Sequence, residues 1–536
     1  MLFKKSIAAL SLTTALVLPM IGAIPAAHAE TPPNMLVVAH RIDDLISLDP
    51  QEMFEFSGTD YANSVYQTLV DYDDRDFSKG FGPSIAESWD ISEDGKTYTF
   101  KIADGMKFAS GNPITAKDVE FSLRRAILLK KTPSFILTQF GFTEDNLGET
   151  LVAKDDSTFV LVTDKKYAPS FVLNCMTSAI ASIVDSKVVQ EHEVDGDLGN
   201  AWLKVNSAGS GAFNLTSWKP NESLTISSNP NFSGGEPAMK RVIIRHIPES
   251  ATQRLLLEKG DVDIARNLTP EDVAGLADDK HLKVQQDLRG RVMYLSMNQG
   301  DETLSNPKVI EAIKYLIDYD GMADSFLKGQ YIVHQAFLPL SYLGELKDKP
   351  FKLDIEKAKA LLAEAGYEDG FEVEFIVRTE QDRLDIAQAL QNNFAQAGIK
   401  VSIIQGTGKE ILGKYRARDF QIYVGVWGPD YPDPQTNADT FASNPDNSLE
   451  AKLTGKLAWR NAWPATGFTE RTEAAVQESD TAKRAQMYVD MQKDFQKEAP
   501  FAIMFQKTEQ NGLGADVEGY SMGAAITGSY YGNVTK

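Results

Sequence analysis

The sequence is very poor in cysteine: Cys175 is the only one among 536 residues. A single cysteine excludes an intrachain disulfide. Cys175 lies within the apolar run FVLNCMTSAI, so we expect a buried and inert thiol there.

Histidines and recognised catalytic motifs are also scarce. The serine between Gly209 and Gly211 lacks the G-x-S-x-G spacing of a nucleophile elbow. The sequence has no H-E-x-x-H helix and no P-loop. We therefore expect no enzymatic activity and no cofactor, and a periplasmic hydrolase is the alternative of another class. None of the histidines beyond the N-terminal segment has the spacing of paired metal ligands: His40, His192, His246, His281 and His334.

Long apolar runs are absent except at the N-terminus. There Lys4 and Lys5 precede an apolar run that ends in the small residues around Ala27 and Ala29. This pattern predicts a signal peptide over residues 1–29, cleaved after Ala29. The alternative, an uncleaved membrane anchor, is disfavoured because the run is short. No cysteine follows for lipid attachment, so we expect a soluble periplasmic protein.

The sequence has few positive charges: it contains 54 Lys and Arg residues and 75 Asp and Glu residues, which gives a net charge of −21. Such an acidic chain disfavours binding to nucleic acid or to anionic membranes. About 500 residues exceed what one hydrophobic core supports, so at least two domains are expected. The charge says little about a small ligand, which meets only a local site.

Secondary-structure patterns differ between the halves of the chain. Residues 87–102 alternate in polarity around Asp94 and Gly95, which predicts a β-hairpin, and Ile114–Ile127 predicts a helix capped by Thr115. In the second half, two amphipathic helices precede strands at 371–377, 399–404 and 420–426, with helices between these strands. This alternation predicts parallel βαβ units.

Two loops follow strands of this predicted sheet, after Val377 and after Val426. Ligands of open α/β sheets bind beyond the carboxyl ends of strands. The second loop places Asp430 and Asp433 among prolines and aromatic residues. Ionised carboxylates near apolar surface are costly unless a cation meets them. The residues alone leave two readings of Asp430: it stabilises a turn beside Pro432, or it awaits a cation from a ligand.

Six blocks of the sequence resemble the dipeptide/oligopeptide-binding proteins of bacterial ABC importers, extracellular solute-binding protein family 5. The resemblance covers nearly all of the chain after the signal peptide. The blocks, in order, are LDPQ (48–51), FSGTDYANSVYQTLVDYD (56–73), IAESWDISEDGKTYTFKIADGMKFASGNPITAKDVEFSLRRA (85–126), SGAFNLTSWKPNESLTISSNPNFSGGEP (210–237), LLLEKGDVDIA (255–265) and WGPDYPDP (427–434).

The resemblance implies a two-lobed α/β periplasmic binding protein of the large cluster C type, with two crossing hinge strands. Residues 30–288 would form lobe I, including an extra α+β subdomain at about 75–185. Residues 289–498 would form lobe II, and residues 499–536 would return to lobe I.

The resemblance also implies a ligand site on the lobe II loop. Asp430 would pair with the α-ammonium of a peptide. Trp427 would supply a flat wall, and backbone contacts would come from Trp427 and Gly428. Asp433 is expected to stabilise the turn before Pro434 and not to touch the ligand.

On lobe I, a short segment matches the part that faces a bound dipeptide in the family. Its backbone would hydrogen-bond the ligand's main chain, as in strand addition. The segment comprises Phe56, Ser57 and Gly58.

A ligand carboxylate needs a cation, and the resemblance points to arginines near the cleft. Arg378 lies in the matching loop, one residue out of register, with Arg383 as a near competitor. Arg266 is a second candidate because it follows a segment that borders the cleft in the family.

The implied function is the periplasmic substrate-binding component of an ABC importer. A monomer would capture di- or oligopeptides and deliver them to the permease subunits in the inner membrane. Non-peptide solutes are the alternatives in the same role: an opine or amino-acid conjugate, a nickel chelate or an oligosaccharide.

Overall fold

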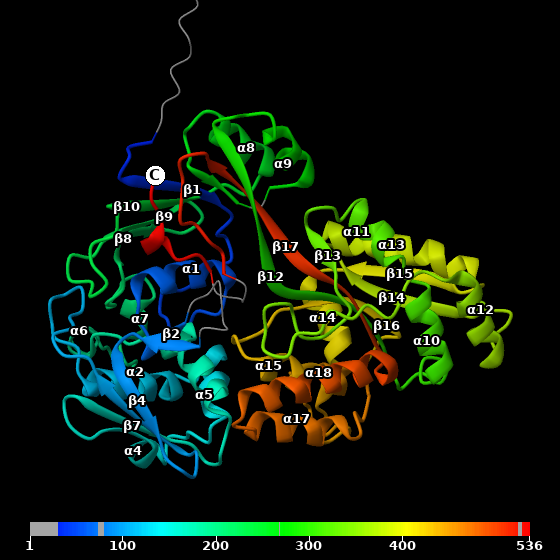
Figure 1. Ribbon diagram of the computed structural model, residues 1–536, viewed down its shortest axis with the longest axis horizontal. Helices are drawn as coiled ribbons and strands as arrows, with labels where there is room; N and C mark the ends of the chain where they lie inside the picture. Colours follow the sequence, from blue (N-terminus) through cyan, green and yellow to red (C-terminus); the bar gives the residue numbers. More distant parts are fainter. Residues whose placement is uncertain (1–30, 73–79, 267, 524–527) are drawn as a thin grey trace, which may run out of the picture.

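The computed structural model describes residues 31–72, 80–266, 268–523 and 528–536. The predicted signal peptide lies outside these ranges. Two lobes are joined by two long strands that cross between them (Figure 1). Within the described ranges, no helix has the length and apolar character needed to cross a membrane.

Lobe I is built on β1 (Met35–His40), an apolar strand with a parallel neighbour on each side. Its core joins residues from both ends of the chain, because Leu36 and Val38 share a cluster with Tyr520 and Tyr531. The other lobe I elements are α1 (Phe56–Val65), β2 (Val70–Tyr72), β3 (Phe81–Pro83), α6 (Ser186–Glu191), α7 (Asn200–Leu203), β8 (Phe213–Lys219), β9 (Ser223–Ser228), β10 (Arg241–His246), α8 (Ser250–Glu258), β11 (Ile264–Ala265) and α9 (Pro270–Leu276).

A subdomain of lobe I contains its own sheet, in the order β4-β5-β7-β6. The predicted hairpin is confirmed, since Ile91 pairs with Tyr98 across the turn. The predicted helix is also confirmed: Thr115 is its N-cap residue, and the Asp118 carboxylate accepts a 2.9 Å hydrogen bond from the Thr115 backbone. The elements are β4 (Ala86–Ile91), β5 (Thr97–Ile102), α2 (Ala116–Leu128), α3 (Phe135–Thr138), α4 (Leu147–Thr150), β6 (Leu151–Ala153), β7 (Thr158–Val162) and α5 (Pro169–Met176).

Lobe II contains the predicted parallel unit. Strand β14 (Glu372–Arg378) lies between β15 (Lys400–Gly406) and β16 (Ile422–Trp427), parallel to both. The loops after β14 and β16 therefore lie at the same edge of the sheet, as predicted. The remaining elements are α10 (Pro307–Tyr315), α11 (Tyr319–Asp324), β13 (Tyr331–Val333), α12 (Ile355–Glu364), α13 (Gln381–Gln396), α14 (Gly408–Arg416), α15 (Pro434–Ala442), α16 (Leu457–Arg460), α17 (Phe468–Gln477) and α18 (Thr481–Glu498).

The hinge consists of β12 (Leu282–Met297) and β17 (Phe501–Gly514), which pair antiparallel along their length. In lobe I, β17 pairs with β11, and in lobe II, β12 pairs with β16. One sheet therefore runs from lobe I through the hinge into lobe II. The register shifts between Leu288 and Val292, so the hinge strands are irregular in their middle.

The two lobes also touch away from the hinge strands, where α5 of the subdomain lies beside lobe II (Figure 1). The rings of Phe171 and Tyr431 are 5.7 Å apart, and Tyr431 belongs to the subdomain's hydrophobic core. The backbone N–H of Ala168 donates a 2.7 Å hydrogen bond to the carbonyl of Val476. The lobes are therefore in contact in this structure.

Candidate ligand-binding site between the lobes

The loop that follows β16 borders a cavity of about 110 Å³, which we call the interlobe cavity. Lobe II supplies Gly428, Pro429, Asp430 and Pro432 to its wall. Lobe I supplies residues from three segments: Met53, Phe54, Glu55, Thr59, Asn63, Pro133, Ile136, Thr177, Ser178, Ala179 and Ile180. A ligand in this cavity would touch both lobes.

Asp430 is the predicted ligand contact, and its carboxyl is half-buried in this wall. Its backbone N–H donates to the Thr436 hydroxyl at 3.1 Å. The carboxyl itself makes no hydrogen bond or ion pair with any residue that the structure describes. Burial raises the pKa of Asp430 to about 7 because water is removed from the carboxylate. An ammonium group would supply the missing counter-charge and hydrogen bonds.

Asp433, three residues further on, has its partners within the protein. It is the N-cap of α15 and accepts a 2.9 Å hydrogen bond from the backbone N–H of Gln435. Its two oxygens accept from Arg484 at 2.9 and 2.6 Å, and both side chains are fully buried. Asn174 of lobe I donates to the same carboxylate at 3.1 Å. The prediction that Asp433 stabilises the turn is confirmed.

The neighbouring residues Trp427 and Gly428 have different surroundings in the structure. Gly428 lies in the wall of the interlobe cavity, whereas Trp427 is the last residue of β16, opposite Val292 of the hinge. Trp427 packs against a hydrophobic cluster of lobe II, and its buried indole N–H has no acceptor within the described ranges. The role of Trp427 as a wall for ligand stays a prediction.

Phe56, Ser57 and Gly58 lie in the first turn of α1, so strand-like pairing with a ligand is wrong for this segment. The Ser57 N–H and hydroxyl donate to Asp44, and the Gly58 N–H donates to the carbonyl of Glu55. A Cβ on Gly58 would lie 3.1 Å from the sulfur of Met53, so Gly58 serves packing at this point. The side chain of Phe56 lies outside the described part of the structure.

The candidate arginines already have acidic neighbours. Arg378 contacts Glu380 at 2.5 Å, and Arg383 lies 3.3 Å from the same carboxylate. Arg266 is buried beside Asp60 and lies 3.5 Å from Glu509. None of the three is among the described residues that line the interlobe cavity. Pairing of Arg378 or Arg266 with a ligand carboxylate stays a prediction.

Sequence reasoning missed Glu55, Ser178 and Arg484. Glu55 directly precedes the block that starts at Phe56, so its position next to a recognised block was the available signal. Ser178 presents a buried hydroxyl without a hydrogen-bond partner in the described structure. Arg484 lies in α18 and is 51 residues from Asp433, a separation at which no local pattern predicts an ion pair.

Comparison with known protein families identifies the family to which this chain belongs. Residues 80–448 match the bacterial extracellular solute-binding proteins, family 5 (middle region). The chain belongs to this family.

Relatives of known name align over most of their length. The probable D,D-dipeptide-binding periplasmic protein of Escherichia coli is 28% identical over 95% of both chains. The dipeptide-binding protein of E. coli is 26% identical over 87% of this chain and 88% of its own.

Solved structures share the fold. A periplasmic binding protein of Helicobacter pylori, in complex with the peptide STSA, superposes with a TM-score of 0.75 at 23% identity. The alignment covers 94% of this chain and 98% of that one. HbpA2 of Haemophilus parasuis gives a TM-score of 0.78 at 23% identity, over 94% of this chain and 99% of its own.

Proposed function

We propose that this chain is the periplasmic substrate-binding component of an ABC importer and that it captures short peptides between its lobes. The observation that carries the proposal is the Asp430 carboxyl, which lies in the interlobe cavity without a counter-charge from the described residues. Relatives named for dipeptide binding support the choice of ligand. The protein acts by binding and release, without catalysis.

In the proposed mechanism, the peptide's α-ammonium pairs with Asp430 of lobe II. Lobe I then contributes polar groups from the opposite wall, including Asn63 and the hydroxyls of Thr177 and Ser178. Because these contacts form together only when the lobes are close, the peptide shifts the protein toward the closed form. The closed form then docks on the permease in the inner membrane.

The peptide's carboxylate is proposed to meet Arg378 or Arg266. Arg378 ends β14, and Arg266 lines a cavity together with Arg289 and Arg291 of the hinge strand β12. Replacing the true partner by glutamine weakens binding of a peptide with a free C-terminus more than binding of its amide. Isothermal titration calorimetry with both peptide forms measures this difference. Equal losses for the two forms would remove that arginine from the site.

Native mass spectrometry of protein purified from its periplasm tests the ligand class. We expect released masses that fragment as di- to pentapeptides. In titrations with such a peptide, Asp430→Asn weakens binding by about 2–5 kcal/mol, or 30-fold and more, because the ammonium loses its charged partner. Asp439→Asn is the matched control, since Asp439 lies on α15 with a side chain that is 45% exposed. A single non-peptide mass would overturn the peptide assignment.

A further inference from the structure

The subdomain of lobe I, from β4 to α5, contacts lobe II away from the hinge strands (Figure 1). The contacts come from residues 168–174, which form the N-cap and most of α5. Three helices of lobe II meet this segment: Val476 lies on α17, Arg484 lies on α18, and Asp433 is the N-cap of α15. We call the contacts of residues 168–174 with lobe II the subdomain latch.

The polar contacts of the latch cross between the lobes without dividing an ion pair. Asn174 donates to the Asp433 carboxylate at 3.1 Å, and the Ser170 hydroxyl accepts from Arg484 at 3.0 Å. Asp433 and Arg484 are paired with each other inside lobe II. Because each charged group keeps this main partner, water can replace Asn174 and Ser170 when the lobes separate. The latch can therefore open without leaving a charge unpaired.

Two apolar side chains of lobe II complete the latch. Tyr431 and Val476 belong to the hydrophobic core of the subdomain, where they are 4% and 6% exposed. The ring of Phe171 on α5 is 5.7 Å from the ring of Tyr431. Separation of the lobes would bring both lobe II side chains into water, which costs free energy. The latch therefore favours the closed form.

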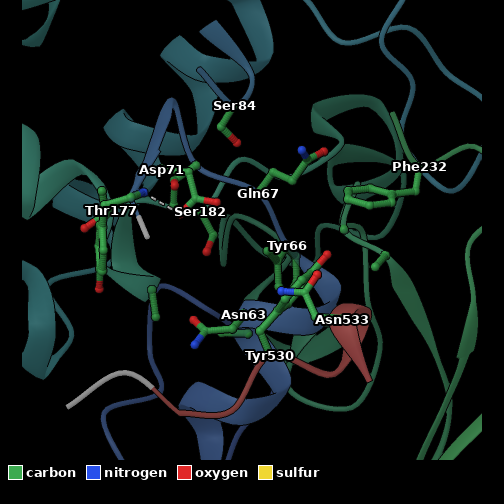
Figure 2. Close-up of a pocket in the computed structure, with 16 residues that line it drawn as sticks. Asn63, Tyr66, Gln67, Asp71, Ser84, Thr177, Ser182, Phe232, Tyr530 and Asn533 are labelled. Atoms are coloured by element: carbon green, nitrogen blue, oxygen red, sulfur yellow. Dashed lines mark hydrogen bonds between the residues drawn. The ribbon is translucent and has the colours of Figure 1, made fainter. Parts of the chain in front are cut away.

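The segment that follows α5 connects the latch to the main part of lobe I. The carbonyl of Ser182 accepts a 2.8 Å hydrogen bond from Gln51, and the Ile183 N–H donates to the Gln67 carbonyl at 2.9 Å. Thr177 and Ser182 line a cavity of about 460 Å³ in lobe I together with Gln67 (Figure 2). The latch residues of α5 are therefore held by lobe I, and opening of the lobes at the hinge would break the latch.

The latch is separate from the candidate ligand site. None of its residues is among the described residues that line the interlobe cavity. A ligand at Asp430 would neither replace nor remove any contact of the latch. The contribution of these contacts to closure is therefore independent of the ligand's chemistry.

We propose that the subdomain is a closure element: through the latch it keeps a fraction of ligand-free molecules closed and adds the same free energy of closure for every ligand. This proposal goes beyond the proposed function and does not depend on peptides being the ligand. When the binding-competent form is only partly populated, the apparent affinity scales with the population of that form. Loosening the latch therefore weakens the binding of all ligands by one common factor.

Pulsed electron spin resonance between two spin labels measures the closed fraction without any ligand. The labels are attached at Asp145→Cys on the subdomain and at Lys493→Cys on α18, which are both exposed positions. A Cys175→Ala background removes the native thiol. We expect two distances in the protein with an intact latch, and the shorter distance belongs to the closed form.

Two variants loosen the latch. Asn174→Asp places a second carboxylate against Asp433 in the closed form only, so the ratio of short to long distances falls by about tenfold or more. Ser170→Ala removes one hydrogen-bond acceptor and lowers the ratio by about threefold. Asn392→Asp is the control, because it makes the same change at an exposed position on α13, and it keeps the ratio unchanged.

Calorimetric titration with Ala-Ala and with Ala-Ala amide completes the test. Asn174→Asp is expected to weaken the binding of both peptides by the same factor. The proposal is wrong if the two losses differ, if the intact latch gives only the long distance, or if neither variant changes the ratio, and in each case the peptide-binding function stands. If wild type binds neither peptide, the proposed function is contradicted, while the spin-label distances still decide the role of the latch.

Discussion

Asp430 and Asp433 lie three residues apart on one loop, with different surroundings. Asp433 is neutralised by Arg484 within lobe II. Asp430 faces a cavity with largely apolar walls and has no such partner among the described residues. A carboxylate that the protein leaves without a cation is suited to a ligand that brings one.

The raised pKa of Asp430, about 7, predicts that peptide binding weakens in acid. The ammonium pairs with the ionised carboxylate, whose fraction falls from about one half at pH 7 to about one hundredth at pH 5. The α-ammonium of the peptide stays protonated throughout this range. We therefore expect about fifty-fold weaker binding at pH 5, measured by calorimetry in a single buffer series.

Asp430→Asn is the control for this pH effect. The variant binds weakly at both pH values and loses the dependence, because the Asp430 carboxyl is no longer present. Wild-type affinity that is constant from pH 7 to pH 5 would mean that Asp430 does not meet the ammonium.

At the scale of helices and strands, the ion pair between Asp433 and Arg484 joins the start of α15 to α18. Asp433→Asn keeps a capping oxygen but leaves the Arg484 guanidinium buried without its counter-charge. We expect the free energy of unfolding to fall by about 3–5 kcal/mol, measured by urea denaturation.

An exposed ion pair provides the comparison for that substitution. Lys400 and Glu372 are 3.3 Å apart, and both side chains are 80% exposed. Lys400→Met is expected to leave the unfolding free energy nearly unchanged, because water already screens this pair. If the unfolding free energy falls by a similar amount in the two variants, burial of the ion pair does not determine how much its loss destabilises the protein.

The alternating strands and helices of lobe II between residues 371 and 427 could be predicted from sequence, because polarity patterns report local burial, whereas α15 to α18 were not predicted. The strands β14, β15 and β16 begin and end within about two residues of the predicted bounds. The segment around Ser57 and Gly58 was predicted as an extended contact, yet it begins α1. Its short polar residues favour no element strongly, and packing of Tyr61 and Val65 into the lobe I core accompanies the helix there.

The candidate site was predictable only in part. Asp430 and Gly428 lie on a loop that follows a strand, and that position is visible in the sequence. A cavity of about 460 Å³ in lobe I is lined by Asn63, Tyr530 and Asn533, and no local pattern connects residues so far apart. The acidic partners of Arg266 likewise come from α1 and β17, so only the folded chain reveals them.

At the scale of the whole molecule, the loop after β16 takes part in both the proposed ligand site and the lobe contact. Asp430 lines the interlobe cavity, while Asp433 accepts a hydrogen bond from Asn174 of lobe I. Ser170 of lobe I accepts a 3.0 Å hydrogen bond from Arg484. The proposed ligand contact and the observed lobe contact therefore involve the same short segment.

This arrangement predicts a ligand-dependent change in overall size. Small-angle X-ray scattering of wild type should show a smaller radius of gyration once a bound peptide is saturating, because the ligand favours the closed form. Asp430→Asn at the same peptide concentration should keep the ligand-free radius. A radius that does not change in wild type would mean that the lobes are closed before the ligand binds.

Lobe I is assembled from the two ends of the chain, and this determines the order in which an exported polypeptide can fold. The lobe II cores use residues up to Phe505. The lobe I core also needs Leu513, Tyr520, Tyr531 and Val534. The residues of this cluster between Leu36 and Ile264 therefore wait for residues 513–534, so this lobe I core is completed after the lobe II cores. Until residues 513–534 pack, the apolar surface of this core is open to misassociation, so this segment determines when lobe I is protected from aggregation.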